Sequence, residues 1–393
     1  MMHTTRGRRA SVAATMAVGS IVVLAGCGTG GGGAAAPTPE QSELGELEGS
    51  VSILAWPGYV EDGTNDPAVD WVSGFEDKTG CTVTAKTYGT SDEGVNLMKT
   101  GDYDVIAASG DATLRLIASG DVAPVNTDLI PNYEGVFDFL KDKEWNTVDG
   151  KSYGVPHGYG ANLLMYDTEV VSPAPTSWSA VFEDASKYAG KVTSYDSPIY
   201  IADAAVYLMA HEPDLGIKNP YALDEEQFAA AVDLLKEQRK SVGEYWSDYL
   251  KEVQAFQSGD SVVGTSWQVI QNVLEGEGAK TAVVLPEEGA TGWSDTWMIA
   301  SKAKSPNCAY AWLDWIASPE ANAQATAYFG EAPSSQAACD FREDCEAFHA
   351  GDEEYASKIW YWTTPIADCV DGRTDVKCVD YGKWTAAWQE IKG

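Results

Sequence analysis

Segments typical of β-strands alternate with segments typical of helices between residues 50 and 120. Short runs of apolar and β-branched residues favour strands, whereas apolar residues spaced three or four positions apart favour helices. The alternation predicts βαβ units, and therefore an α/β fold with mostly parallel sheets. The predicted strands are 51–56, 81–86 and 104–108, and the predicted helices are 69–79, 93–99 and 112–119.

A second set of such segments follows residue 190, and the chain is long enough for two domains. The Pro- and Ser-rich segment Met165–Trp178 lies between the two sets, and we interpret it as a connection into a second domain. The strands expected in the second set are 191–195, 261–266, 281–285 and 296–300, and the helices are 201–209, 224–239 and 307–317.

The N-terminus has the pattern of a secretory signal peptide. Three arginines precede an apolar stretch, 10–25, which is shorter and richer in small residues than a membrane span of about 20 apolar residues. The following Leu24-Ala25-Gly26-Cys27 resembles the bacterial lipobox, in which the cysteine thiol receives a diacylglycerol and becomes the first mature residue. The alternative is a plain signal peptide with a chance cysteine. General secretion is favoured over twin-arginine export, because only the arginine pair of that motif is present.

Residues 28–39 are Gly, Ala, Thr and Pro, which cannot bury apolar surface. We therefore expect 27–49 to be a flexible tether with a reach of about 25 Å. No later segment is apolar enough to span a bilayer, so a lipid on Cys27 is the expected anchor. The folded part is then expected outside the cytoplasmic membrane, in a periplasmic space or on the outer face.

The formal net charge of the chain is −33. A surface this acidic repels nucleic acid and anionic lipid headgroups and attracts cations, so nucleic acid is not an expected partner. Solubility is the simpler alternative role for the charge.

Six cysteines remain once Cys27 carries the lipid, and an even number in an exported protein indicates disulfides. The sequence leaves 15 pairings open. The simplest assignment joins the short-range pairs Cys339–Cys345 and Cys369–Cys378. Cys81 would then pair with Cys308. A thiol metal site is not expected, because no CxxC motif occurs. The candidates are Cys81, Cys308, Cys339, Cys345, Cys369 and Cys378.

Motifs of catalysis are missing from the sequence. The four histidines stand apart from any HExxH pattern, and there is no GxSxG, no P-loop and no GxGxxG after a strand. We therefore expect neither an enzyme nor a cofactor nor a metal, although the abundant carboxylates leave a secreted hydrolase open as an alternative.

Aromatic residues are abundant, with 14 Trp and 19 Tyr, and several lie at turns beside acids. Ring faces attract a cation by about 0.5–2 kcal/mol each, and carboxylates form charge-assisted hydrogen bonds with ammonium protons. This combination indicates a site for an organic amine, whereas core packing is the ordinary role of any single Trp. The turns that carry it are Trp56–Tyr59, Trp267–Gln268 and Trp293–Trp297.

Four segments, in the same order, resemble the extracellular spermidine/putrescine-binding proteins of ABC importers. They are the run from Trp56, Tyr103–Ser109, Val262–Trp267 and Gly292–Asp295. The resemblance covers about residues 50–335 and implies a type II periplasmic-binding-protein-like fold. Two α/β domains are joined by crossing strands, the ligand lies in the cleft between them, and the closed monomer docks on a membrane permease.

The signal peptide is expected at 1–26 and the tether at 27–49, from the residues described above. The resemblance implies the boundaries of the two domains that follow. The first domain is 50–164 plus 296–335, and the second is 165–295 plus 336–393, which ends in a disulfide-braced extension.

Site residues carry over from the family position by position. Trp56 and Tyr59 match an aromatic pair, and Trp267 matches a ring that stacks on the methylene chain. Asp295, the strongest candidate, matches the carboxylate that grips an ammonium group. Ser109 and Trp293 match an amine-binding serine and a further ring of the cage.

The sequence departs from the family at several positions, where acidic residues are lost or gained. The second-domain acidic stretch keeps Asp196, with Tyr200 nearby, but has lost its second acid. Asp111 stands where an aromatic is expected, and Glu331 stands where a tyrosine is expected. The pocket should still prefer a cation, whereas the identity of the amine stays open. The alternatives are a receptor for an amino acid derivative, a quaternary amine or a peptide, and a structural lipoprotein.

Overall fold

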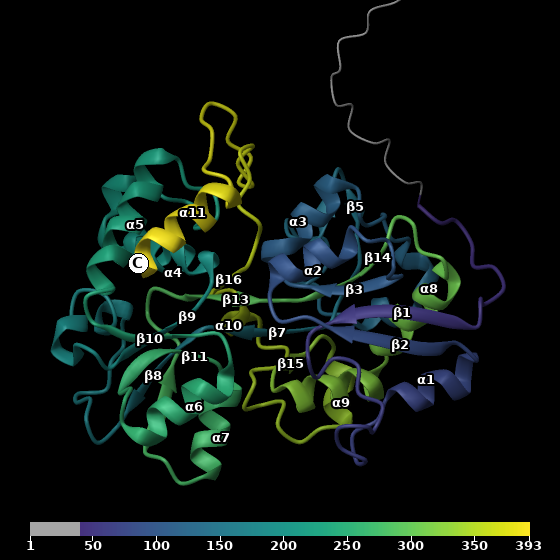
Figure 1. Ribbon diagram of the computed structural model, residues 1–393, viewed down its shortest axis with the longest axis horizontal. Helices are drawn as coiled ribbons and strands as arrows, with labels where there is room; N and C mark the ends of the chain where they lie inside the picture. The colour runs from purple at the N-terminus through teal and green to yellow at the C-terminus, as the bar shows by residue number, and fades with distance from the viewer. Residues whose placement is uncertain (1–39) are drawn as a thin grey trace, which may run out of the picture. The chain divides into compact units, whose positions relative to one another are not determined.

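The first five-stranded sheet is built largely from the βα alternation at the start of the chain (Figure 1). It is seen in a computed structural model that describes residues 40–393. The three strands β1, β2 and β3 are parallel, and β14 runs antiparallel to β3. Strand β6 is antiparallel to β14 and so has the same direction as β1, β2 and β3, which makes the sheet mostly parallel as expected. The sheet order is β2 (Thr82–Thr87), β1 (Ser50–Ala55), β3 (Val105–Ala108), β14 (Thr296–Ile299) and β6 (Val155–Pro156).

Helices cover both faces of this sheet, because its strands are apolar on both sides. Ile53 and Ala107 belong to the core under one face, and Leu54 and Ile106 to the core under the other. We call the sheet and its helices the first lobe. The helices are α1 (Val72–Thr79), α2 (Ser91–Met98), α3 (Gly110–Ser119), α8 (Pro306–Ile316) and α9 (Pro319–Phe329). A small hairpin, β4 (Thr147–Val148) and β5 (Lys151–Ser152), precedes β6.

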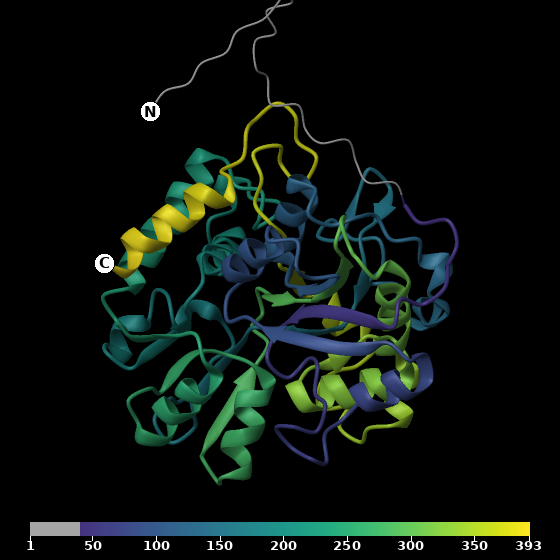
Figure 2. The same ribbon diagram turned by 45° about the vertical axis from the view of Figure 1, so that its right-hand side comes forward.

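The second five-stranded sheet and its helices form the second lobe, at the left of Figure 1 and seen from another side in Figure 2. Its strands β9, β10 and β11 are parallel, and β8 runs antiparallel to β11. Strand β12 is antiparallel to β8 and so has the same direction as the first three. The order is β10 (Val242–Trp246), β9 (Val192–Tyr195), β11 (Val263–Ser266), β8 (Leu163–Asp167) and β12 (Thr281–Val284). The helices are α4 (Ile201–His211), α5 (Glu225–Gln238), α6 (Tyr249–Ser258), α7 (Gln268–Gly276) and α11 (Tyr381–Lys392).

A third sheet carries the chain from one lobe to the other. Its two inner strands, β7 (Gly158–Ala161) and β13 (Ala290–Trp293), run antiparallel to each other. Each of them leads from a strand of one lobe directly into a strand of the other, so they are crossing strands. The outer strands are β15 (Ala332–Pro333) and β16 (Ile359–Tyr361).

The expected connection at Met165–Trp178 is misplaced. Residues 163–167 already form β8, an inner strand of the second sheet, so the chain crosses between the lobes at Asn162. The reason is that β8 pairs with strands about 100 residues away, which local composition does not reveal.

The C-terminal segment 336–393 does not belong wholly to the second lobe, in contrast to our expectation. Phe348 and Tyr361 pack in a core of the first lobe, and Arg342 donates hydrogen bonds to the Glu331 carbonyl and the Thr326 hydroxyl there, each at 2.8 Å. Only the part around α11 packs in the second-lobe core. The short helix α10 (Glu353–Ala356) precedes β16. The remaining domain boundaries stay a prediction.

The predicted disulfide pairing is confirmed: the bonds are Cys81–Cys308, Cys339–Cys345 and Cys369–Cys378. The end of the expected tether is bound to the first lobe, because Glu48 accepts hydrogen bonds from the backbone N–H groups of Asn307 and Cys308 at the start of α8. The predicted signal peptide, the lipidated Cys27 and the rest of the tether through residue 39 lie outside the described residues.

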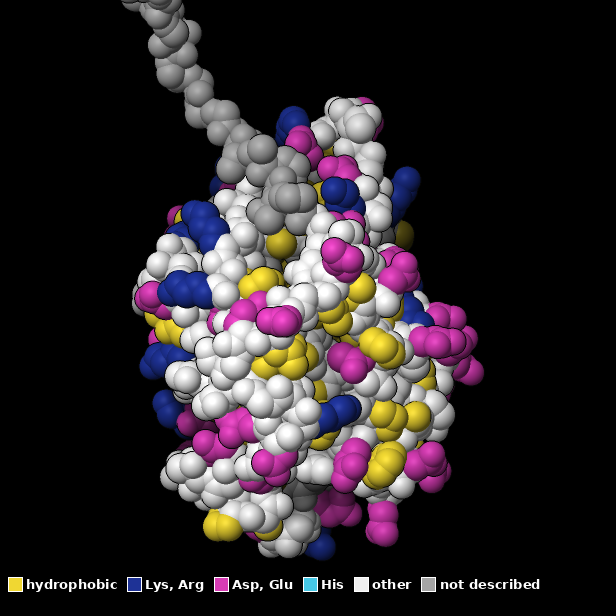
Figure 3. Space-filling view, turned by 90° about the vertical axis from the view of Figure 1, so that its right-hand side faces the viewer, with side chains coloured by type: hydrophobic (Ala, Val, Ile, Leu, Met, Phe, Trp, Pro, Cys, Tyr) yellow, Lys and Arg dark blue, Asp and Glu magenta, His cyan; other side chains and the backbone are white. Residues whose placement is uncertain are grey.

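Acidic side chains are spread across the face shown in Figure 3, in agreement with the net charge of −33. Within residues 40–393, no helix combines the length and the apolar character that crossing a lipid bilayer requires.

Candidate functional site

A cleft of about 410 Å³ is lined by residues of both lobes. Its residues follow the carboxyl ends of parallel strands, where open α/β sheets place their ligand sites. Trp56 follows β1, Ser109 follows β3, Asp196 follows β9, and Trp267 follows β11. The topology of both sheets therefore directs these loops toward one space.

Indole rings form a continuous wall in the cleft. The ring of Trp267 lies 4.9 Å from that of Trp246 and 5.2 Å from that of Trp293, measured between centroids. Trp362 follows 6.1 Å beyond Trp293. A Cβ atom on Gly160 of β7 would lie 2.2 Å from the Trp293 ring, so only glycine admits the ring at this place. These rings can stack on an alkyl chain or face a cation.

Asp295 supplies a buried carboxylate at the turn between β13 and β14. The residue is 3% exposed, and its Oδ2 accepts a hydrogen bond from the Tyr59 hydroxyl at 3.0 Å. Its Oδ1 has no hydrogen-bond partner among the residues that the structure describes. Burial raises the pKa of Asp295 to about 7, because the charged form loses its hydration. A cation placed against Oδ1 would favour the ionised form.

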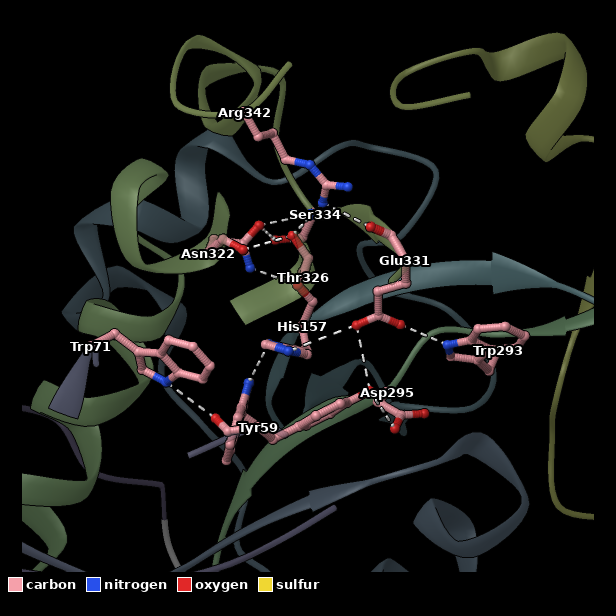
Figure 4. A network of polar contacts seen from close by, with 11 residues as sticks. Tyr59, Trp71, His157, Trp293, Asp295, Asn322, Thr326, Glu331, Ser334 and Arg342 are labelled. Carbon is pink, nitrogen blue, oxygen red and sulfur yellow. Dashed lines mark hydrogen bonds and ion pairs between the residues drawn. The ribbon is translucent and has the colours of Figure 1, made fainter. Parts of the chain in front are cut away.

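A buried network behind the cleft holds these groups (Figure 4). Glu331 accepts a hydrogen bond from Trp293 Nε1 at 2.6 Å, and its other oxygen lies 3.4 Å from the Tyr59 hydroxyl and 3.7 Å from His157 Nε2. Burial and then the nearby Asp295 raise the pKa of Glu331 to about 8, and burial lowers the pKa of His157 to about 3. Glu331 therefore fixes the orientation of the Trp293 indole rather than facing a ligand.

Asp111 lies at the start of α3, and both of its carboxylate oxygens are occupied. Oδ1 accepts a hydrogen bond from the Ser91 hydroxyl at 2.8 Å, and Oδ2 accepts one from the Tyr381 hydroxyl at 3.2 Å. Burial raises its pKa to about 6. This acid joins the first lobe to α11 of the second.

Asp196 is the second-lobe acid of the cleft, and it is ion-paired. Lys392 Nζ lies 2.7 and 2.9 Å from its two oxygens, and Trp388 Nε1 donates a hydrogen bond to Oδ1 at 2.8 Å.

Most of the predicted site residues line the same cleft, and their role in binding stays a prediction. The seven that do so are Trp56, Ser109, Asp111, Asp196, Trp267, Trp293 and Asp295. Three do not. Tyr59 and Glu331 lie behind the wall, as described above. Tyr200 lies in the second-lobe core, where its hydroxyl accepts hydrogen bonds from Ser194 and Gln238, because the start of α4 points it inward.

Several cleft residues were missed by sequence reasoning. Trp246 ends β10, and Tyr381, Trp388 and Lys392 come from α11. A signal for α11 existed, because large aromatic residues recur at 381, 384 and 388 with helical spacing. In the described part of the chain, no group of three or more His, Cys, Asp or Glu side chains is placed to hold a metal ion.

Comparison with known proteins gives consistent matches. The family described as bacterial extracellular solute-binding protein matches residues 70–348. A putrescine/agmatine-binding protein of Pseudomonas aeruginosa is 24% identical over 74% of this chain and 79% of its own. The putrescine-binding periplasmic protein PotF of Escherichia coli is 22% identical with the same coverage.

Solved structures share the fold. The spermidine/putrescine substrate-binding protein PotD of Streptococcus pneumoniae has a TM-score of 0.67 at 18% identity, covering 87% of this chain and 98% of its own. The Tp0655 lipoprotein of Treponema pallidum has a TM-score of 0.69 at 17% identity, with 87% and 99% covered. The expected type II periplasmic-binding-protein-like fold is confirmed.

Proposed function

This chain belongs to the bacterial extracellular solute-binding protein family, and from this premise we propose that it captures a polyamine or a related organic cation for an ABC importer. Proteins of this family bind small solutes for transport and work outside the cytoplasm. The finer proposal is that the cargo is an amine and that the closed, loaded form delivers it to a permease.

The carboxylate of Asp295 is the observation that carries the proposal. It is buried, one of its oxygens has no partner within residues 40–393, and indole rings surround the space in front of it. Burial raises the pKa of this acid to about 7, so above that pH a neutral or anionic solute would leave a buried carboxylate without a counter-charge, which is unfavourable. An ammonium group provides the charge and the hydrogen-bond donors together. The names of the relatives point to the same class of ligand.

Closure of the two lobes is the proposed mechanism of capture. The cleft is lined by residues of both lobes, which are joined by the strands β7 and β13. A ligand held by one lobe can recruit the other by a hinge motion at these strands. No bond is broken, and binding energy is used for closure.

Location at the membrane is a further part of the proposal. We propose export by the signal peptide 1–26 and lipidation at Cys27, so that a monomer stays near its permease. Mass spectrometry of the membrane-extracted chain tests this, because lipidation adds a diacylglycerol mass to a chain that begins at Cys27.

A thermal-shift screen of the full chain as purified tests the ligand class. The panel contains diamines, amino alcohols, quaternary amines, basic amino acids, sugars and dicarboxylates. We expect amines to raise the unfolding temperature by mass action. Stabilisation by a sugar or a dicarboxylate, with none by any amine, would contradict the proposal.

Affinity for an amine is expected to depend on pH. The pKa of Asp295 in the free protein is about 7, and a bound cation requires the ionised form. Affinity is therefore full above pH 7 and falls about tenfold for each pH unit below it, which amounts to about 100-fold between pH 8 and pH 5. Calorimetric titration at several pH values measures this.

The variant Asp295→Asn provides the control for the pH profile. In this variant the fall in amine affinity near pH 7 should disappear. A smaller fall near pH 6 should remain, because burial raises the pKa of Asp111 to about 6. A wild-type affinity that is constant from pH 8 to pH 5 would show that no cation contacts Asp295.

A further inference from the structure

The second-lobe end of the cleft already contains a cation that belongs to the protein. Lys392 Nζ contacts both oxygens of Asp196, at 2.7 and 2.9 Å. The indole N–H of Trp388, one turn earlier on α11, donates to the same carboxylate. The Asp196 carboxylate is thus already bound by a primary ammonium group and an indole N–H of the protein. The ammonium group takes the place that the amine end of a ligand would take.

The helix that carries Lys392 is firmly packed. Trp384, Trp388 and Ile391 are buried in the second-lobe core. The backbone carbonyl of Lys392 accepts a hydrogen bond from Arg239 Nε at 3.2 Å, and the Asp380 side chain caps the start of the helix. Helix α11 therefore holds the side chain of Lys392 at the cleft.

The other acids of the cleft are also engaged, with one exception. Asp92 pairs with Arg115 at 2.7 Å. Asp111 accepts hydrogen bonds from Ser91 and Tyr381. Among the acids that line the described cleft, only Asp295 has a buried carboxylate oxygen without a partner.

We propose that the ligand carries a single cationic group, which Asp295 holds, and an uncharged remainder that lies along the indole wall. The inference rests on the proposed capture of an organic cation and, within that proposal, favours the related organic cation over a polyamine. A second ammonium at the far end would meet the Lys392 ammonium and an acid that is already neutralised, so it would lose its hydration without compensation. Diamines are then selected against by α11.

A second observation supports an uncharged polar remainder. The indole N–H of Trp362, on the cleft wall, is buried and has no acceptor within residues 40–393. A hydroxyl or carbonyl group of the ligand would satisfy it, whereas a second ammonium group offers no lone pair. An amino alcohol or an amino amide has the required combination of groups.

Matched ligand pairs test the proposal. Calorimetry at pH 8 compares α,ω-diamines with α,ω-amino alcohols of the same length, from three to six carbons, on the full chain. We expect the best amino alcohol to bind at least tenfold more tightly than the diamine of equal length. In Lys392→Met, which frees Asp196, we expect the diamine to gain at least tenfold and the amino alcohol to change little.

Two variants serve as controls. Lys392→Arg keeps the ion pair and should keep the wild-type preference. Lys236→Met makes the same charge change on α5, where the lysine pairs with Glu390 at 3.5 Å on the outer side of α11, and should leave the ratio unchanged.

The outcomes separate the two proposals. Diamine binding by the wild type that equals or exceeds amino alcohol binding, or a ratio that Lys392→Met leaves unchanged, overturns this inference alone. If the wild type binds no amine of either series, the proposed function is contradicted as well.

Discussion

Replacement of Asp295 by asparagine is expected to weaken the binding of an organic amine by about 30-fold or more. Removal of one partner from a buried, hydrogen-bonded charge pair raises the free energy of binding by about 2–5 kcal/mol, and 1.4 kcal/mol corresponds to a factor of ten. The asparagine carbonyl can still accept the hydrogen bond from Tyr59. Its amide, however, would present N–H donors to the ammonium group in place of the unpartnered Oδ1.

The fold should tolerate this substitution. Burial raises the pKa of Asp295 to about 7, so above that pH the native protein holds an ionised carboxylate at a site that disfavours its charge. The free energy of unfolding is therefore expected to stay constant or to rise in Asp295→Asn at pH 8. Calorimetry gives the affinity, and chemical denaturation gives the stability.

A matched control is available at the opposite end of β3. Asp102→Asn makes the same change of charge at an exposed loop position before this strand and should leave amine affinity unchanged. An affinity of Asp295→Asn within threefold of the wild type would remove Asp295 from the site, whatever the control does.

Loss of the Cys81–Cys308 disulfide is expected to lower the free energy of unfolding by about 5 kcal/mol. The bond joins residues 227 apart in sequence, so it removes a large loop entropy from the unfolded chain. Both cysteines are buried, and alanine replaces them without burying an unpaired hydroxyl. Cys81 precedes β2, at the end of the sheet opposite to the cleft, so the affinity of the double alanine variant should stay that of the wild type.

The short disulfide Cys339–Cys345 provides the comparison, with a separation of only 6 residues. Its removal is expected to lower the free energy of unfolding by about 2 kcal/mol. Urea denaturation of the two double alanine variants measures the difference. Equal losses in the two variants would show that loop entropy does not determine the effect of the long-range bond.

Local patterns were sufficient to predict much of the first lobe, and together with the family resemblance they placed seven of the residues that line the cleft. The strands β1 and β3 have short apolar runs and β2 has alternating β-branched residues, and that information lies within each segment. Because parallel strands end at one edge of a sheet, Trp56 and Ser109 could be assigned to one site from sequence, whereas Trp267, in the other lobe, was assigned by the resemblance to the family.

Long-range pairing accounts for the parts that could not be predicted. The strand β14 inserts antiparallel beside β3 although the two are about 190 residues apart, and no local property of either specifies this partner. Lys392 lies 196 residues from Asp196, so sequence reasoning assigned to that acid a free charge that the fold neutralises. Tyr59 and Glu331 were assigned to the ligand from their positions in the family pattern, whereas the fold uses them to hold Asp295 and Trp293.

Calorimetric titration of the full chain with an amino alcohol and with the diol of the same length tests the central claim most directly. The two ligands differ only in the group that would meet Asp295. We predict that the amino alcohol binds with one-to-one stoichiometry and that the diol binds at least about 100-fold more weakly, because only the ammonium group balances the buried carboxylate. Equal binding of the two ligands, or tighter binding of the diol, would contradict the account.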